Sequence, residues 1–141
     1  MLIAETTFWE EPGLMLALLA NCLTLDPSIL LVRHTLYVLE DKGKKIGFIA
    51  VKRHSSRILE RGALYVYPEH RKKGYGRKLM LYTLKKHRRV YILCNKDDER
   101  LKQKQGFRLI ERVPSPLAWR RDFYNTFVTL LTGKTIIVMK R

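Results

Sequence analysis

The chain has 141 residues, of which 46% are hydrophobic, and a formal net charge of +15. This length suits one globular domain with a sizeable core, so we expect a single domain over residues 1–141. The two cysteines, Cys22 and Cys94, form no Cys-x-x-Cys pair. This argues against a disulfide framework and a thiolate zinc site, and it suits a reducing cytoplasm.

The charge is unevenly distributed. Residues 1–30 contain four acidic residues and no Lys or Arg, so residues 31–141 carry +19, and residues 70–96 contain ten Lys and Arg and no acid. Such a field attracts polyanions, among them coenzyme A (CoA) and nucleic acid; alternatively, it only keeps the protein soluble. The apolar stretch Leu14–Leu25 is interrupted by polar residues and is too short to cross a bilayer, so we expect no membrane contact. The acidic start does not fit a secretory signal.

The first half of the chain predicts a short strand and helices, followed by three strands. The apolar run Met1–Ala4 precedes a strong helix former at 14–20, and Asp26-Pro27 marks the start of a short second helix. Strands are expected at 35–40, 46–51 and 58–67, with a turn at 41–44 between the first two and a bulge at Gly62 in the third.

The second half alternates helices and strands. Helices are expected at 74–87, 97–104 and 115–131, and strands at 90–94, 107–113 and 135–139. Gly106 and Gly133 fit helix ends, and Ser115 fits an N-cap. The order predicts a mixed α/β fold with helices on both faces of the sheet.

The loop after the third of these strands carries the strongest functional signal. Val66 is followed by Tyr-Pro-Glu-His and then by a basic, Gly-rich run that leads into a helix, Arg71, Lys72, Lys73, Gly74, Tyr75, Gly76 and Arg77. Glycines permit close approach of a ligand, and backbone N–H groups at a helix N-terminus favour a diphosphate. The alternative is a plain strand-to-helix turn with solvated lysines.

This run resembles the acyl-CoA-binding motif of the GNAT superfamily of N-acetyltransferases, Gln or Arg-x-x-Gly-x-Gly or Ala. The likeness extends over roughly residues 30–112 and implies the acyl-CoA N-acyltransferase fold, a central, mostly antiparallel sheet with helices on both faces. It implies that the backbone from Arg71 to Arg77 holds the CoA pyrophosphate, that Val66 pairs with the pantetheine arm, and that acetyl-CoA is the co-substrate without a metal.

A second family signature is met only in part. Asn95, Gly106 and Phe107 stand at its spacings, but Asp98 replaces its alanine and Lys102 replaces its tyrosine. In many members that tyrosine is the general acid. Lys102 either donates the proton with a pKa lowered by burial or is a solvated surface lysine.

The remaining catalytic groups follow from the resemblance. The N–H of Val66 would be an oxyanion donor. Glu60 lies where some members carry a catalytic glutamate and is our candidate base; alternatively, it is an edge carboxylate paired with Arg57 or Arg61. Glu69 is a weaker candidate, and transfer through ordered water without a dedicated base is a further alternative.

Other polar and aromatic residues carry weaker signals. Asn95 either binds the CoA arm or caps the following helix. Tyr65, Tyr67 and Tyr75 line the acceptor cleft or belong to the core. Cys94 fits a buried small residue, and the four histidines, His34, His54, His70 and His87, lack metal-ligand spacing. Residues 132–135 end like a Walker loop, but Val128 occupies the position of its first glycine.

Two functions remain open at this point. The first is an acetyl-CoA-dependent N-acetyltransferase acting on a primary amine: a protein N-terminus, a lysine, a small amine or aminoacyl-tRNA. The second is a catalytically weak relative that binds CoA or nucleic acid through its basic surface, as Lys102 would favour. The aromatic residues of the helix at 115–131 cover the acceptor site, form a homodimer interface or pack on the sheet, so both a monomer and a homodimer are compatible with the sequence.

Overall fold

The computed structural model of the protein describes residues 1–21 and 32–141. Cys22 and the helix expected after Asp26-Pro27 lie outside the described residues. The chain forms two compact units, which are described separately: residues 1–53 with 61–87, and residues 54–60 with 88–141. The single domain of residues 1–141 stays a prediction.

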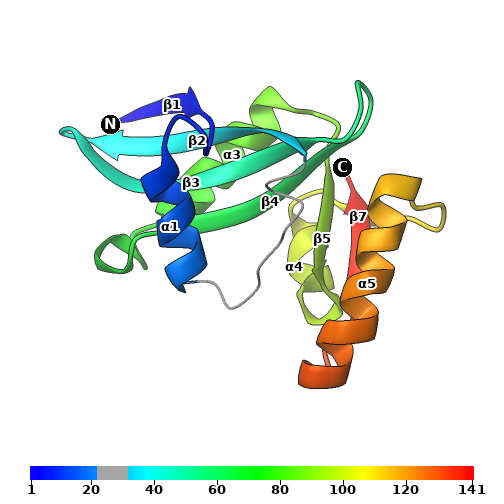
Figure 1. The fold of residues 1–141 in the computed structure, drawn as a ribbon. Coiled ribbons are helices and arrows are strands. Elements are labelled where there is room, and N and C mark those ends of the chain that lie inside the picture. Colours follow the sequence, from blue (N-terminus) through cyan, green and yellow to red (C-terminus); the bar gives the residue numbers. More distant parts are fainter. Residues whose placement is uncertain (22–31) are drawn as a thin grey trace. The chain divides into compact units, whose positions relative to one another are not determined.

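The first unit is built on an antiparallel sheet. Strands β1 (Leu2–Thr6), β2 (Arg33–Asp41) and β3 (Lys44–Arg53) pair in sequence order (Figure 1). Lys42 and Gly43, between β2 and β3, both have positive φ, which suits a tight two-residue hairpin turn. Strand β4 (Leu59–Val66) follows β3 in the sheet order, and just beyond it the N–H of Tyr67 donates to the carbonyl of Ile46 at 3.0 Å.

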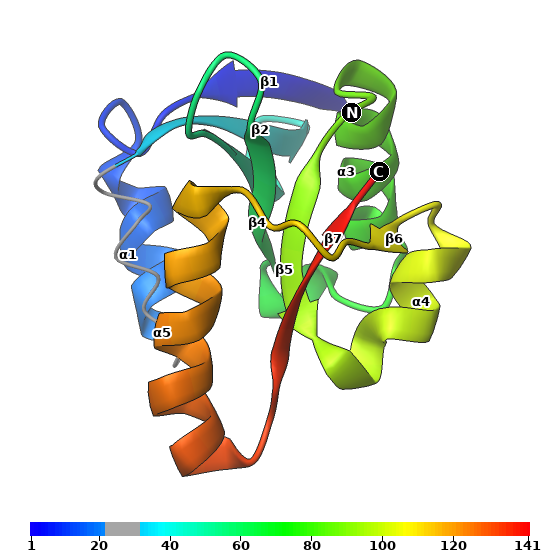
Figure 2. The same cartoon turned by 90° about the vertical axis from the view of Figure 1, so that its right-hand side faces the viewer.

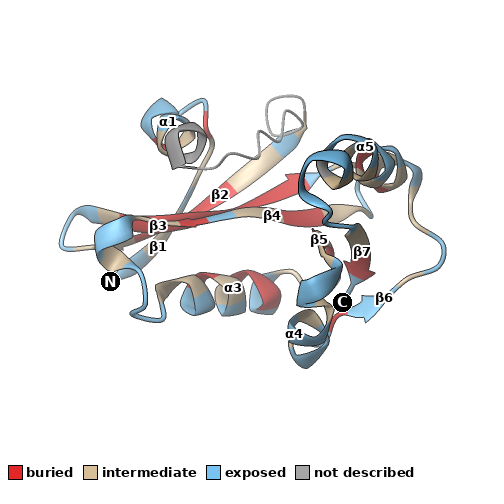
Figure 3. Cartoon of the chain, turned by 90° about the horizontal axis from the view of Figure 1, so that it is seen from below, coloured by how far each residue is buried: buried red, intermediate tan, exposed pale blue. Residues whose placement is uncertain are grey.

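Helices cover both faces of this sheet. On one face, side chains of β2 and β3 form a core with Phe8 and with Leu14 of α1 (Pro12–Asn21). On the opposite face lies α3 (Tyr75–Lys86), which buries Leu79 and Leu84 (Figure 3). The two helices can pack in this way because alternate residues of a strand point to opposite faces.

The second unit contains the remaining strands. Strand β5 (Tyr91–Asn95) pairs antiparallel with β7 (Ile136–Lys140), which pairs antiparallel with β6 (Arg108–Leu109). Glu60 of β4 is the register partner of Tyr91 in a parallel arrangement. Antiparallel pairs therefore predominate in both units, and the predicted mixed α/β fold is confirmed.

Three helical segments complete the second unit: η2 (Lys96–Asp98), α4 (Glu99–Lys104) and α5 (Ser115–Thr132). Figure 2 shows the chain passing from β6 into α5 and returning through β7. Leu117 of α5 is fully buried against Tyr91 and Val138. The Asn125 side chain also binds the first residue of β7, because its amide donates to the Ile136 carbonyl at 3.0 Å and its oxygen accepts from the Ile136 N–H at 2.6 Å.

One predicted strand length and one predicted N-cap were wrong. The strand expected at 107–113 is only two residues long, because Ile110 and Val113 pack against the core instead of extending the strand. Ser115 is not the N-cap of α5. The carbonyl of Pro114 accepts the N–H of Ala118 at 2.9 Å, so Pro114 is the N-cap and Ser115 is the first helical residue, where the predicted range also began.

Two glycine predictions had different outcomes. The bulge expected at Gly62 stays a prediction: Gly62 does not have a positive φ, whereas the next residue, Ala63, has a φ of 24°. Gly133 ends α5 as expected, with a φ of 68° and an N–H that donates to the carbonyl of Thr129 at 2.8 Å. A left-handed residue at this position satisfies a carbonyl of the last helical turn.

Candidate active site

The basic loop of the first unit folds into a strand-to-helix connection with an uncapped helix end. A short helical turn, η1 (Pro68–His70), precedes it, and Gly74 stands at the N-cap of α3 with a φ of 79° and no side-chain cap. The first helical hydrogen bond runs from the N–H of Lys78 to the carbonyl of Gly74 at 3.0 Å. The N–H groups of Tyr75, Gly76 and Arg77 therefore have no acceptor in the helix and are available to an anion.

The two glycines leave room for such an anion. A Cβ at Gly74 would have no neighbour within 4 Å, and one at Gly76 would lie 3.6 Å from Leu64 and 3.7 Å from Val66. Arg71, Lys72, Lys73, Arg77 and Lys78 are basic residues in or next to this loop. Open backbone, a helix N-terminus and surrounding cations fit the diphosphate of a CoA molecule.

Val66 presents two backbone groups with different surroundings. Because the N–H of Tyr67 points to Ile46 of β3, the N–H of Val66 points to the opposite edge of β4. The carbonyl of Val66 accepts a hydrogen bond from Nε of Arg71 at 2.9 Å, and the guanidinium carbon of Arg71 lies 5.7 Å from the ring centroid of Tyr65. The Arg71 side chain thus donates to the Val66 carbonyl, part of the backbone that the family likeness pairs with the pantetheine arm.

The candidate acceptor-site tyrosines have core contacts. Tyr65 is buried, with its ring centroid 5.6 Å from that of Phe48 and 5.2 Å from that of Tyr67. Burial raises the pKa of Tyr67. Tyr75 is half-buried beside His70. Tyr65 therefore belongs to the core, as one of the two alternatives for these tyrosines predicted.

Glu60 lies in the second unit at the centre of a buried charged cluster. The residue is 2% exposed, and its Oε2 accepts hydrogen bonds from the guanidinium of Arg120 and from Nε2 of His54, the latter at 2.7 Å. Both partner side chains are also nearly fully buried. Glu60 is therefore a buried carboxylate with hydrogen bonds to Arg120 and His54. The alternative pairing with Arg57 or Arg61 stays a prediction.

The sequence contains a signal for Arg120, although Arg120 was not among the predicted site residues. It follows Leu117 by three positions and precedes Tyr124 by four, so it lies on the same side of α5 as the apolar residues. A long cationic side chain on such a face requires a buried acid, and Glu60 supplies it. His54 has no comparable local signal.

Asn95 and Lys102 lie on the segment that follows β5. Asn95 is the N-cap of η2 but makes no side-chain capping bond, so the capping role is wrong and the contact with CoA stays a prediction. Lys102 is half-buried on α4, and its carbonyl accepts the N–H of Phe107 at 3.1 Å. Cys94 is buried, with its sulfur 3.9 Å from that of Met139, as expected for a core residue.

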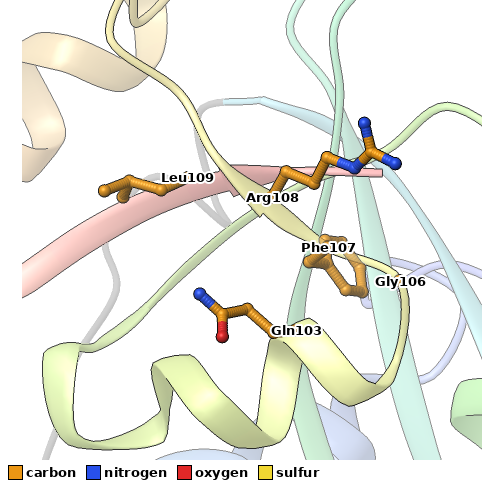
Figure 4. Close-up of a pocket in the computed structure, with 5 residues that line it drawn as sticks. All are labelled: Gln103, Gly106, Phe107, Arg108 and Leu109. Carbon is orange, nitrogen blue, oxygen red and sulfur yellow. The ribbon is translucent and has the colours of Figure 1, made fainter.

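A pocket of about 400 Å³ also opens in the second unit. Gln103 of α4 and the segment Gly106–Leu109 line it (Figure 4). None of the candidate catalytic residues lines this pocket, so it does not enter the proposed reaction. In residues 1–21 and 32–141, no helix is long and apolar enough to cross a membrane, and no group of three or more His, Cys, Asp or Glu could hold a metal.

Comparison with known sequences matches this chain to a protein family. Residues 32–109 match the family model described as "Acetyltransferase (GNAT) domain", which covers more than half of the chain. The peptidyl-lysine N-acetyltransferase YiaC of Escherichia coli K12 is 26% identical over 110 residues, which are 76% of this chain and 73% of that protein.

Comparison with solved structures gives the same fold. Escherichia coli ElaA is similar with a TM-score of 0.64 at 16% identity, and the match covers 99% of both chains. An aminoglycoside 6'-N-acetyltransferase complexed with CoA is similar with a TM-score of 0.61 at 13% identity, and the match covers 100% of this chain and 96% of that one. At these identities the likeness establishes the fold alone.

Proposed function

Because the chain belongs to the GNAT family of acetyltransferases, we propose that it transfers the acetyl group of acetyl-CoA to a primary amine by direct attack. The observation that carries this proposal is the N-terminus of α3, where Gly74 and Gly76 leave three N–H groups and the space beside them open among basic side chains. This arrangement suits a diphosphate, and CoA contains one.

In this proposal each catalytic residue has a separate task. The backbone from Arg71 to Arg77 and the Asn95 side chain hold CoA, which supplies the acetyl group as a thioester. The N–H of Val66 stabilises the developing oxyanion, which is worth a few kcal/mol in comparable sites. Glu60 takes the proton from the attacking amine, and Lys102 returns a proton to the leaving thiolate.

The Glu60 assignment needs a test that separates catalysis from structure, since Arg120 and His54 already hold its carboxylate. Glu60→Gln keeps an oxygen acceptor and removes the basic group. If Glu60 is the base, kcat falls by about 100-fold and the acidic limb of the pH–rate profile disappears. An unchanged profile, with activity that follows only the folded fraction, would assign Glu60 a structural role.

We propose a lysine side chain of a protein as the acceptor. The support is the Escherichia coli relative, which is named as a peptidyl-lysine N-acetyltransferase. The net charge of +15 would favour lysines in acidic segments, since a basic enzyme repels a basic peptide. A protein N-terminus and a small amine are the other candidate acceptors, and we place the reaction in the cytoplasm.

A catalytically weak protein that binds CoA or nucleic acid is the alternative. The observation that favours it is Lys102, which stands where the family signature has a tyrosine. A salt-sensitive affinity for RNA or DNA without acetyl-CoA turnover would support this alternative.

Calorimetry with acetyl-CoA tests the proposed site. The variant Gly74→Asp/Gly76→Asp places two carboxylates where the diphosphate should lie. Gly13→Asp/Gly43→Asp is a matched control, because Gly13 is the second residue of α1 as Gly76 is of α3, and Gly43 has a φ of 74° beside 79° for Gly74.

We expect micromolar binding by the native chain and the control, and loss of binding in the loop variant. Binding that survives in the loop variant would place the ligand elsewhere. No binding by the native chain would refute the acetyltransferase proposal. A panel of lysine peptides with acidic or basic flanks, followed by CoA release, then identifies the acceptor.

A further inference from the structure

One helix of the second unit presents a continuous apolar ridge. Trp119, Phe123, Phe127 and Leu131 follow one another at every fourth position of α5, so their side chains form a single row along the helix. Their exposed fractions lie between 46% and 83%, and the ring centroids of Phe123 and Phe127 are 4.7 Å apart. Leu130, beside the row, is 84% exposed. We call these five residues the α5 ridge.

The ridge is as large as the largest apolar patch that a soluble monomer usually exposes. An aromatic side chain can bury about 200 Å², so at these exposures the ridge presents on the order of 500 Å² of apolar surface. The largest apolar patch of a typical monomer is roughly 300–600 Å² and is often functional. Two such ridges packed together would bury about 1,000 Å², which is the lower bound for a specific protein–protein interface.

The charge on α5 indicates which occupant fits. Its charged residues are Arg120, which is buried with Glu60, and Arg121 and Asp122, which pair with each other at 2.7 Å. The exposed surface of the helix is therefore neutral on a chain of net charge +15. A polyanion or an acidic membrane would gain no attraction here, whereas two like-charged copies can approach each other best at a neutral surface.

The spacing of the ridge also suits self-association. A two-fold interface requires a surface that is complementary to itself. If two copies of α5 cross antiparallel, Phe123 of one faces Phe127 of the other, and Trp119 faces Leu131. Rows at four-residue spacing from two helices interdigitate in the commonest class of helix packing.

We propose that the protein forms a homodimer through the α5 ridge, in an antiparallel two-fold arrangement centred between Phe123 and Phe127. The interaction is independent of acetyl transfer. Leu117, Arg120 and Asn125 fix the other side of α5 to its own unit, so the ridge is presented without a large ordering cost. The small interface predicts a dimer in the micromolar range.

Sedimentation velocity of the full chain, from about 1 to about 200 µM, tests the proposal over the affinities that such an interface supports. Phe123→Glu and Phe127→Lys should each raise the dimer dissociation constant by about tenfold or more, as expected for central apolar contacts. Leu101→Glu on α4 is the control, since Leu101 is as exposed as Phe127 but lies outside the ridge. An equimolar mixture of the two ridge variants should recover a heterodimer, because the introduced carboxylate of one chain would face the introduced ammonium group of the other.

Several results would overturn the proposal. The native chain could stay monomeric at the highest concentration, or Phe123→Glu and Phe127→Lys could dimerise like the Leu101→Glu control. An equimolar mixture of the two ridge variants could also remain monomeric. A monomer in which Trp119 fluorescence is shielded from quencher, in a Trp9→Phe background, would show that the same chain covers the ridge. A native chain that is monomeric in solution but binds anionic vesicles would assign the ridge to a membrane surface.

Discussion

The buried pair of Arg120 and Glu60 allows a quantitative prediction of stability. Arg120→Met keeps the apolar stem of the side chain but removes the guanidinium from the carboxylate of a residue that is 2% exposed. Loss of one partner from a buried ion pair costs about 3–5 kcal/mol, and we expect the lower value because His54 retains its contact with Glu60. A loss of about 3 kcal/mol is a large fraction of the roughly 5–15 kcal/mol that stabilises a typical domain.

Urea denaturation followed by circular dichroism measures this loss. Arg121→Met is the control, since Arg121 pairs with Asp122 at the surface and such a pair contributes about 1 kcal/mol or less. The double variant Glu60→Leu/Arg120→Met removes both charges and should be more stable than Arg120→Met alone. If Arg120→Met and Arg121→Met cost the same within about 0.5 kcal/mol, the buried pair does not anchor α5 as we describe.

Three further predictions concern other positions. Gly47→Ala should lower the free energy of unfolding by about 2 kcal/mol in the same assay, because a Cβ at Gly47 would overlap the Tyr65 carbonyl. Gly76→Ala has room for a Cβ and should be neutral or stabilising. Equal costs for the two variants would contradict the close packing at Gly47. Burial lowers the pKa of His87 from 6.5, so as the pH falls through 6.5 the unfolded chain binds more protons than the folded chain, and the free energy of unfolding decreases. His87→Gln should therefore reduce the pH dependence of stability, measured by denaturation at several pH values. If the dependence is unchanged in the variant, it arises from other titratable groups. Lys102→Met should lower kcat by about 100-fold without changing acetyl-CoA affinity, and an unchanged kcat would remove Lys102 from the proposed mechanism.

The sequence predicted the elements that local patterns encode. The helix at α3 follows from its apolar spacing and the glycines that precede it, and the β2–β3 hairpin follows from Asp41-Lys-Gly-Lys44 between two apolar runs. The left-handed residues at Gly106 and Gly133 were also predictable, because glycine adopts positive φ without a steric cost.

The predictions that were wrong depend on contacts between distant residues. The strand at 107–113 is shortened because Ile110 and Val113 enter a core formed with Leu117 and Val138, and no local pattern encodes this choice. The Glu60 cluster likewise joins residues 60 positions apart. The loop could be identified from its motif, but the position of Arg71 over Tyr65 and the Val66 carbonyl depends on packing.

The double hydrogen bond of Asn125 to Ile136 has a consequence for the order of folding. It joins residues only 11 positions apart, whereas the pairing of β5 with β7 joins Asn95 to Ile136, 41 positions apart. Short loops close at a smaller entropic cost than long ones. We therefore expect α5 and β7 to assemble early as a local unit. The hydrogen bonds of the Asn125 side-chain amide would hold Ile136 in an extended conformation before β5 pairs with β7. Asn125→Leu would then slow refolding more than it speeds unfolding in stopped-flow measurements.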